Sequence, residues 1–158
     1  MTDQNAQHHG GCYCGAVKVS VSEPPMAAGF CHCLACRKWH SAPINAWAIW
    51  PADKVTVSGD VVSAEVDAGS QRLSCAKCGG AIGNGKPTLD MTVIYAMSLA
   101  GSDFKFEPTM HVWYAERVMD VNDGLPKFAD FPEGFGGTGE LMEVFSSRGI
   151  DVQLTNPE

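Results

Sequence analysis

Basic side chains are scarce in this sequence, where 11 lysines and arginines stand against 18 aspartates and glutamates. The formal net charge is therefore -7 at pH 7, with histidine counted as neutral. Proteins that bind the phosphate backbone of nucleic acids need a positive surface to neutralise it. This composition offers no uniform basic surface, so we expect no nucleic-acid partner.

Long apolar runs are also missing. No stretch approaches the roughly 18 apolar residues that a membrane-spanning helix needs, and the polar start of the chain lacks the pattern of a secretory signal. We therefore expect no membrane partner and a cytoplasmic location. A length of 158 residues with 45% hydrophobic residues suits one domain with its own core. We predict a single zinc-binding domain over residues 1–158.

Short β-prone runs recur along the chain between glycine, proline, aspartate and serine. In Gly15–Ser22, three valines alternate with polar residues and place β-branched side chains on one face. Similar runs follow at Ile44–Trp50, Val55–Val57, Val61–Val66, Gln71–Ser74, Thr92–Leu99 and His111–Glu116. The pattern predicts a mainly β fold with short helical segments.

Two short helices are expected within this β-rich chain. One turn or helix covers Leu34–His40, and a second spans Glu140–Ser147 with Thr138 as its cap. Residues 120–139 hold five glycines and two prolines, which favours loop. We therefore predict that residues 120–158 form a loop-rich C-terminal extension.

The number and spacing of the cysteines are informative. Seven cysteines are an odd count without a secretion signal, which argues against a framework of disulfides. At most two residues separate each of them from another cysteine, whereas structural disulfides usually close long loops. The clusters indicate metal, and the positions are Cys12, Cys14, Cys31, Cys33, Cys36, Cys75 and Cys78.

Four of these cysteines come in two pairs, Cys12-Tyr-Cys14-Gly and Cys75-Ala-Lys-Cys78-Gly. Zinc binds thiolates at about 2.3 Å in a tetrahedron, so its sulfurs lie only about 3.8 Å apart, and cysteines on a tight turn can satisfy this. Neither pair completes a tetrahedron alone, so we assign all four to one structural zinc. A reduced buried pair or a redox dithiol is the alternative, although the βαβ context of thioredoxin-like pairs is absent.

The remaining three cysteines lie within six residues, in Cys31-His-Cys33-Leu-Ala-Cys36. Three thiolates leave the fourth position of a zinc ion free for water or a substrate thiol, which is typical of catalytic zinc. His40 or His111 closing the site is the structural alternative. An iron–sulfur cluster would lack its fourth thiolate.

Several basic residues flank the two cysteine groups and offer local positive charge. They can offset thiolate charge or hold a carboxylate of an anionic substrate, although an exposed solvated side chain is the simpler role for each. These residues are Arg37, Lys38, Arg72, Lys77 and Lys86.

The motifs together resemble the glutathione-dependent formaldehyde-activating enzyme family. They are Gly11-Cys-Tyr-Cys-Gly-Ala-Val17, Cys31-His-Cys-Leu-Ala-Cys-Arg-Lys38 with Ala42-Pro43, Cys75-Ala-Lys-Cys-Gly79 and Pro108-Thr-Met-His-Val-Trp113. The resemblance covers most of residues 10–113. Trp39, His40 and Ser41 depart from the family pattern beside the expected open site.

This resemblance implies a β-tent fold of several small antiparallel sheets stapled by two zinc ions, one structural and one catalytic. It implies a carbon–sulfur lyase that condenses glutathione with formaldehyde to S-(hydroxymethyl)glutathione, with Cys31, Cys33 and Cys36 at the catalytic ion. Two other functions compete with it. A non-enzymatic, zinc-stapled protein-binding module is the first alternative. A methionine sulfoxide reductase is the second, but it needs a cysteine outside the clusters.

Overall fold

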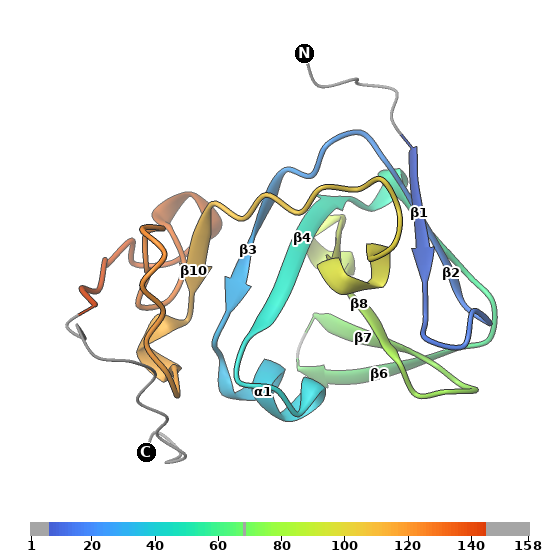
Figure 1. Ribbon diagram of the computed structural model, residues 1–158, viewed down its shortest axis with the longest axis horizontal. Helices are drawn as coiled ribbons and strands as arrows, with labels where there is room; N and C mark the ends of the chain where they lie inside the picture. Colours follow the sequence, from blue (N-terminus) through green and yellow to red (C-terminus); the bar gives the residue numbers. More distant parts are fainter. Residues whose placement is uncertain (1–6, 68, 145–158) are drawn as a thin grey trace. The chain divides into compact units, whose positions relative to one another are not determined.

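The computed structural model describes residues 7–67 and 69–144 (Figure 1). The fold is mainly β with short helical segments, as the sequence predicted. The chain forms two compact units, the first made of Met1–Ala28 and Trp47–Phe106 and the second of Gly29–Ala46 and Glu107–Glu158. In the described part of the chain, no helix has the length and apolar character of a membrane-spanning segment.

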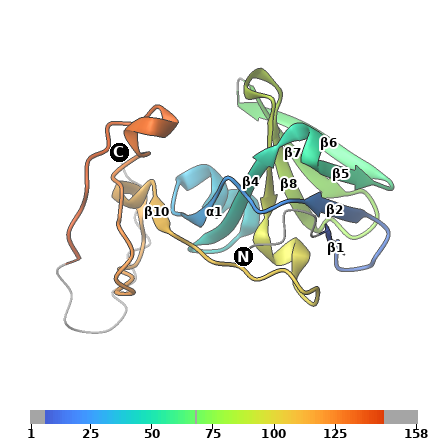
Figure 2. The same ribbon diagram turned by 90° about the horizontal axis from the view of Figure 1, so that it is seen from above.

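Antiparallel strands make up the first unit. One sheet has the strand order β1-β2-β5, from β1 (Gln7–Gly11), β2 (Lys18–Ser22) and β5 (Val55–Ser58). In the other, neighbouring strands pair in the order β4 (Asn45–Pro51), β9 (Met91–Tyr95), β8 (Ala81–Lys86), β7 (Ser70–Cys75) and β6 (Val61–Asp67). Figure 2 shows β6, β7 and β8 side by side. Three 3-10 turns connect strands, at Ala52–Lys54, Pro87–Leu89 and Ala96–Leu99.

The core of the first unit contains the valine face predicted for Gly15–Ser22, the run that includes β2. Val17, Val19 and Val21 are buried and pack with Trp50 and Ile82 in one apolar cluster. The Trp50 indole N–H donates to the backbone oxygen of Glu23 at 3.0 Å, so its polar atom is satisfied. This core supports the two cysteine loops of the unit, because Cys75 belongs to it and Cys12 packs against it.

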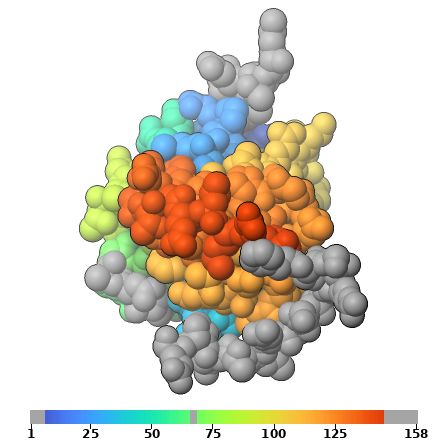
Figure 3. All heavy atoms as spheres, turned by 90° about the vertical axis from the view of Figure 1, so that its left-hand side faces the viewer, coloured from blue at the N-terminus to red at the C-terminus, as the bar shows by residue number. Residues whose placement is uncertain are grey.

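Among its described residues, the second unit holds one α-helix, α1 (Leu34–His40), where the sequence predicted it. Strand β10 (Met110–Val112) pairs in parallel with the end of β3 (Ala27–Cys31), with Val112 opposite Cys31. Two 3-10 turns follow at Tyr114–Glu116 and Glu133–Phe135. Figure 3 shows the later residues of this unit, coloured orange to red, packed into one continuous surface.

Three of the elements that the sequence predicted differ in the structure. The strand expected over Thr92–Leu99 ends at Tyr95 and continues as a 3-10 turn. The strand expected over His111–Glu116 ends at Val112, because Trp113 takes a left-handed conformation with φ of 55°. The predicted C-terminal helix is wrong for residues 140–144, and residues 145–147 lie outside the described residues.

The C-terminal segment pairs with the preceding loop instead of coiling. The Ala129 N–H donates to the Glu140 oxygen, and the Met142 N–H donates to the Lys127 oxygen, both at 2.8 Å. These backbone bonds use groups that a helix would need for its own ladder. Thr138 caps no helix, and its hydroxyl donates to the Asp130 carboxylate at 2.7 Å.

Candidate metal centres

Two loops of the first unit bring four cysteines together. The turn between β1 and β2 carries Cys12 and Cys14, and it is closed by a bond from the Cys12 N–H to the Val17 oxygen at 3.1 Å. Gly15 follows with φ of 79°, a left-handed conformation that glycine adopts without steric cost. The Val17 N–H in turn donates to the Cys12 sulfur at 3.2 Å.

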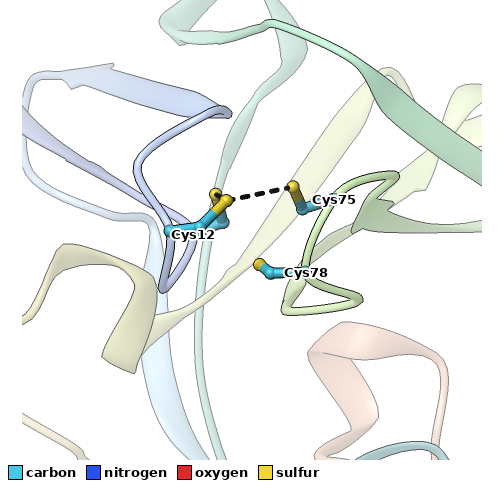
Figure 4. Close-up of side chains that lie close together, drawn as sticks. Cys12, Cys75 and Cys78 are labelled. Carbon is cyan, nitrogen blue, oxygen red and sulfur yellow. Dashed lines mark hydrogen bonds between the residues drawn. The ribbon is translucent and has the colours of Figure 1, made fainter.

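Cys75 is the last residue of β7, and Cys78 lies in the loop that follows it. The Gly79 N–H donates to the Cys75 oxygen at 2.8 Å, and Gly79 has φ of 72°. Figure 4 shows the side chains of Cys12, Cys75 and Cys78 converging from the two loops. All four sulfurs lie within 4.8 Å of one another, with Cys12–Cys14 at 3.6 Å and Cys14–Cys75 at 3.8 Å.

The four-sulfur group fits zinc in both distance and charge. A tetrahedral zinc needs sulfurs about 3.8 Å apart, which matches the measured separations. Backbone hydrogen bonding from Val17 lowers the pKa of Cys12 to about 6, against the opposing effect of burial. The Ala16 backbone works to lower the pKa of Cys14, but burial and the neighbouring sulfurs raise it to about 11. A divalent cation relieves this repulsion and allows all four thiols to ionise.

The side chain between these ligands points outward. Tyr13 is 98% exposed, whereas the Cys75 sulfur on the facing loop belongs to a buried residue.

All seven cysteines are free, which excludes a disulfide within either group.

Three cysteines of the second unit form the other group. Cys31 ends β3, Cys33 is the N-cap of α1, and Cys36 lies in its first turn. The Cys33 sulfur accepts the Cys36 N–H at 3.3 Å, which fixes the loop around the helix start. The three sulfurs lie within 4.8 Å of one another.

These thiols cannot all ionise without a cation. Hydrogen bonding with Cys33 and Cys36, followed by burial, raises the pKa of Cys31 well above its ordinary value. The bond with Cys31 works to lower the pKa of Cys33, but the Cys36 sulfur and burial together raise it above its ordinary value. A metal ion supplies the charge that stabilises three neighbouring thiolates.

Neither histidine suggested as a fourth ligand joins this group. Among the described residues, no histidine or carboxylate atom is gathered with the three sulfurs. Both ring nitrogens of His111 have other partners. Its Nδ1 lies 2.8 Å from His32 Nε2, and its Nε2 lies 2.8 Å from Asp123 Oδ2. His32, between two of the cysteines, is fully buried and contacts His111 instead of the sulfurs.

The flanking basic residues have mixed roles. Arg37 Nε donates to the His32 oxygen at 3.1 Å, beside the three-cysteine group. Arg72 is buried and its guanidinium donates to the Tyr95 hydroxyl at 3.1 Å, so it supports the sheet. Lys86 donates to the Ser70 hydroxyl.

The profile of the glutathione-dependent formaldehyde-activating enzyme family matches residues 7–116, which contain all seven cysteines. The chain belongs to this family.

Two individual proteins are also similar to this member of the family. An uncharacterized lyase of Schizosaccharomyces pombe is 30% identical over 75 residues, which are 46% of this chain and 53% of that protein. The chain thus matches about half the length of this curated relative. A crystal structure of a Rhodobacter sphaeroides protein has 20% identity and a TM-score of 0.46, over 59% of this chain and 88% of that one.

Some side chains near the three-cysteine group escaped the sequence analysis. The Glu116 carboxylate accepts the Leu34 N–H at 2.5 Å, at the start of α1. Asp123 and Lys127 lie beyond the residues that the family profile matches. Lys127 donates to the Asp123 carboxylate, and Asp123 also bonds to His111. Acidic and basic residues of a loop carry no local pattern that indicates such contacts. Pairing of β10 with β3 is the feature that brings them near.

Proposed function

We propose that this chain is a zinc-dependent carbon–sulfur lyase that condenses a small thiol, glutathione or a similar one, with an aldehyde such as formaldehyde. It holds two zinc ions, a structural one on Cys12, Cys14, Cys75 and Cys78 and a catalytic one on Cys31, Cys33 and Cys36. Family membership supports this reaction class, and the two separate sulfur groups support the division of roles.

The observation that carries the proposal is the second group itself, three sulfurs gathered without a fourth protein ligand among the described residues. A closed four-ligand zinc only supports structure, whereas three protein ligands leave a position for a substrate. Zinc bound there supplies a Lewis acid that stabilises a substrate thiol as its thiolate.

The reaction then needs little more than alignment. The substrate sulfur attacks the aldehyde carbon and forms the C–S bond, the carbonyl electron pair moves to oxygen, and that oxygen takes a proton to become a hydroxyl. The proton lost by the thiol balances the one gained. Two contacts hold the ligand loop for this step, from Glu116 to the Leu34 N–H and from Arg37 to the His32 oxygen. A loop fixed in this way lowers the entropic cost of bringing both reactants together.

NMR exchange measurements test this proposal. Exchange of formaldehyde between its hydrate and the glutathione adduct is followed with and without protein that carries two zinc ions per chain. We expect faster exchange with the protein and none of this gain with Cys33→Ser at the same concentration. Unchanged exchange at full zinc loading would contradict the enzyme and leave the zinc-stapled binding module.

A further inference from the structure

A row of four polar side chains, three of them buried and the fourth, Asp123, exposed, ends at the three-cysteine group. Lys127 Nζ lies 2.5 Å from Asp123 Oδ1, Asp123 Oδ2 lies 2.8 Å from His111 Nε2, and His111 Nδ1 lies 2.8 Å from His32 Nε2. Both histidines are 0% exposed and Lys127 is 4% exposed. All four residues belong to the second unit.

The acceptors in this row fix where each proton lies. Asp123 is ionised, because hydrogen bonds from Lys127 and His111 lower its pKa to about 2 even though burial opposes this. Its carboxylate accepts, so His111 carries a proton on Nε2 and a lone pair on Nδ1. His32 then donates from Nε2 to this lone pair. Burial lowers the pKa of His111 and so favours its neutral ring, although the Asp123 carboxylate acts in the opposite direction.

The ring and backbone of His32 are held on several sides. Its N–H donates to the Val112 oxygen at 3.1 Å, and its oxygen accepts from Arg37. The ring packs edge-on against Tyr114 with centroids 4.8 Å apart. Because Cys31 and Cys33 are its direct neighbours in the chain, a shift of the His32 backbone moves both sulfurs.

We propose that Asp123 is a positioning residue for the three-cysteine metal site. Through its bond to His111 it holds His32, and with His32 it holds the backbone of Cys31 and Cys33 on either side. The inference rests on the proposed catalytic zinc. Outer partners that orient a metal site change its affinity by about 10- to 100-fold when they are removed. Asp123 and Lys127 follow the family-matched residues, so this support comes from the C-terminal extension of this chain.

The first test measures metal affinity of the second site. Metal-free protein receives one equivalent of zinc for the four-sulfur site, and cobalt(II) is then titrated while its thiolate charge-transfer absorption is recorded. Loss of this absorption in Cys33→Ser assigns the signal. Asp123→Asn should weaken cobalt binding about 10- to 100-fold, and Asp123→Glu should recover part of it.

Asp120→Asn is the matched control. Asp120 is a partly buried carboxylate of the same segment, but it bonds to Arg117 and the Tyr114 hydroxyl in place of a histidine. We expect its cobalt affinity to stay within about two-fold of wild type. Equal affinity in Asp123→Asn and wild type would overturn the inference. A wild-type protein that never takes a second metal ion would instead overturn the catalytic site itself.

The second test uses the wild-type protein alone and therefore needs no variant to fold. Nitrogen-15 NMR of the histidine side chains reports which ring nitrogen of His32 carries the proton. We expect the proton on Nε2. A proton on Nδ1 of wild-type His32 would contradict the row of donors and acceptors, and with it the role of Asp123.

Discussion

Single cysteine substitutions should separate the two metal groups. Cys33→Ser is expected to lower the zinc content from two ions per chain to one and to leave the fold intact, because its sulfur group lies in one short segment. Cys78→Ser should abolish folding, since binding of a structural zinc contributes on the order of 10 kcal/mol. Metal analysis and circular dichroism check both variants. A folded Cys78→Ser protein would contradict the structural role.

His111 should make stability depend on pH. Burial lowers its pKa below the unfolded value of 6.5, even though Asp123 acts in the opposite direction. Below about pH 6.5 the unfolded state therefore binds more protons, and the free energy of unfolding falls as pH drops towards the folded pKa. Urea unfolding at about pH 7.5 and about pH 5.5 measures this slope.

Two variants isolate the contribution of this ring. His111→Gln should flatten the slope, although it also weakens the protein at every pH. His9→Gln removes an exposed histidine of the first unit and should leave the slope unchanged. An equal slope in wild type and His111→Gln would show that other groups cause the pH dependence.

The turn between β1 and β2 depends on a glycine. A Cβ on Gly11 would lie 2.2 Å from the Val17 oxygen, which is a backbone atom that cannot move without breaking the Cys12–Val17 bond. Gly11→Ala should cost about 1–3 kcal/mol and weaken zinc binding by the four-cysteine group. Gly134→Ala, with no atom within 4 Å, is the control and should stay within about 0.5 kcal/mol. Thermal unfolding compares the two, and equal losses would contradict this account.

Elements rich in valine and isoleucine were predictable, and those specified by their neighbours were not. β2 occurs where its alternating valines indicated, and α1 occurs at Leu34–His40 as expected although it contains neither residue. β1, β3 and β8 were missed because they contain glycine, alanine and histidine in place of a β-branched alternation. A Cβ on Gly83 of β8 would lie 2.5 Å from the Val93 oxygen of the neighbouring strand β9. Glycine at this position therefore allows β8 to pair with β9.

At the scale of the whole molecule, metal removal should cost most of the stability. The four-sulfur group joins Cys14 to Cys75 across 61 positions of the sequence. Structural zinc contributes roughly 10–16 kcal/mol, which is as large as the total stability of a domain, about 5–15 kcal/mol. A strong chelator should therefore abolish cooperative thermal unfolding, and added zinc should restore it. An unchanged melting temperature in protein shown to be free of zinc would contradict this.

The candidate site was predictable only where its residues are local in sequence. Spacing alone divided the seven cysteines as the structure does, because a tight turn limits how far two sulfurs can separate. The contacts of His32 with His111 and of His111 with Asp123 span 79 and 12 positions. Pairing of β10 with β3 brings the two histidines together, and a bridge between His111 and Lys127 brings the loop of Asp123 to His111. One zinc-binding domain over the whole chain stays a prediction.

The two sulfur groups also differ in when they can form during synthesis. Cys31, Cys33 and Cys36 are complete as soon as residue 36 has left the ribosome, whereas the other group waits for Cys78, 42 residues later. At about 5–20 residues per second this delay is roughly 2–8 s. A nascent chain thus completes the site proposed for the catalytic zinc before the site proposed for the structural zinc, and we expect the order of metal capture to follow the order of translation.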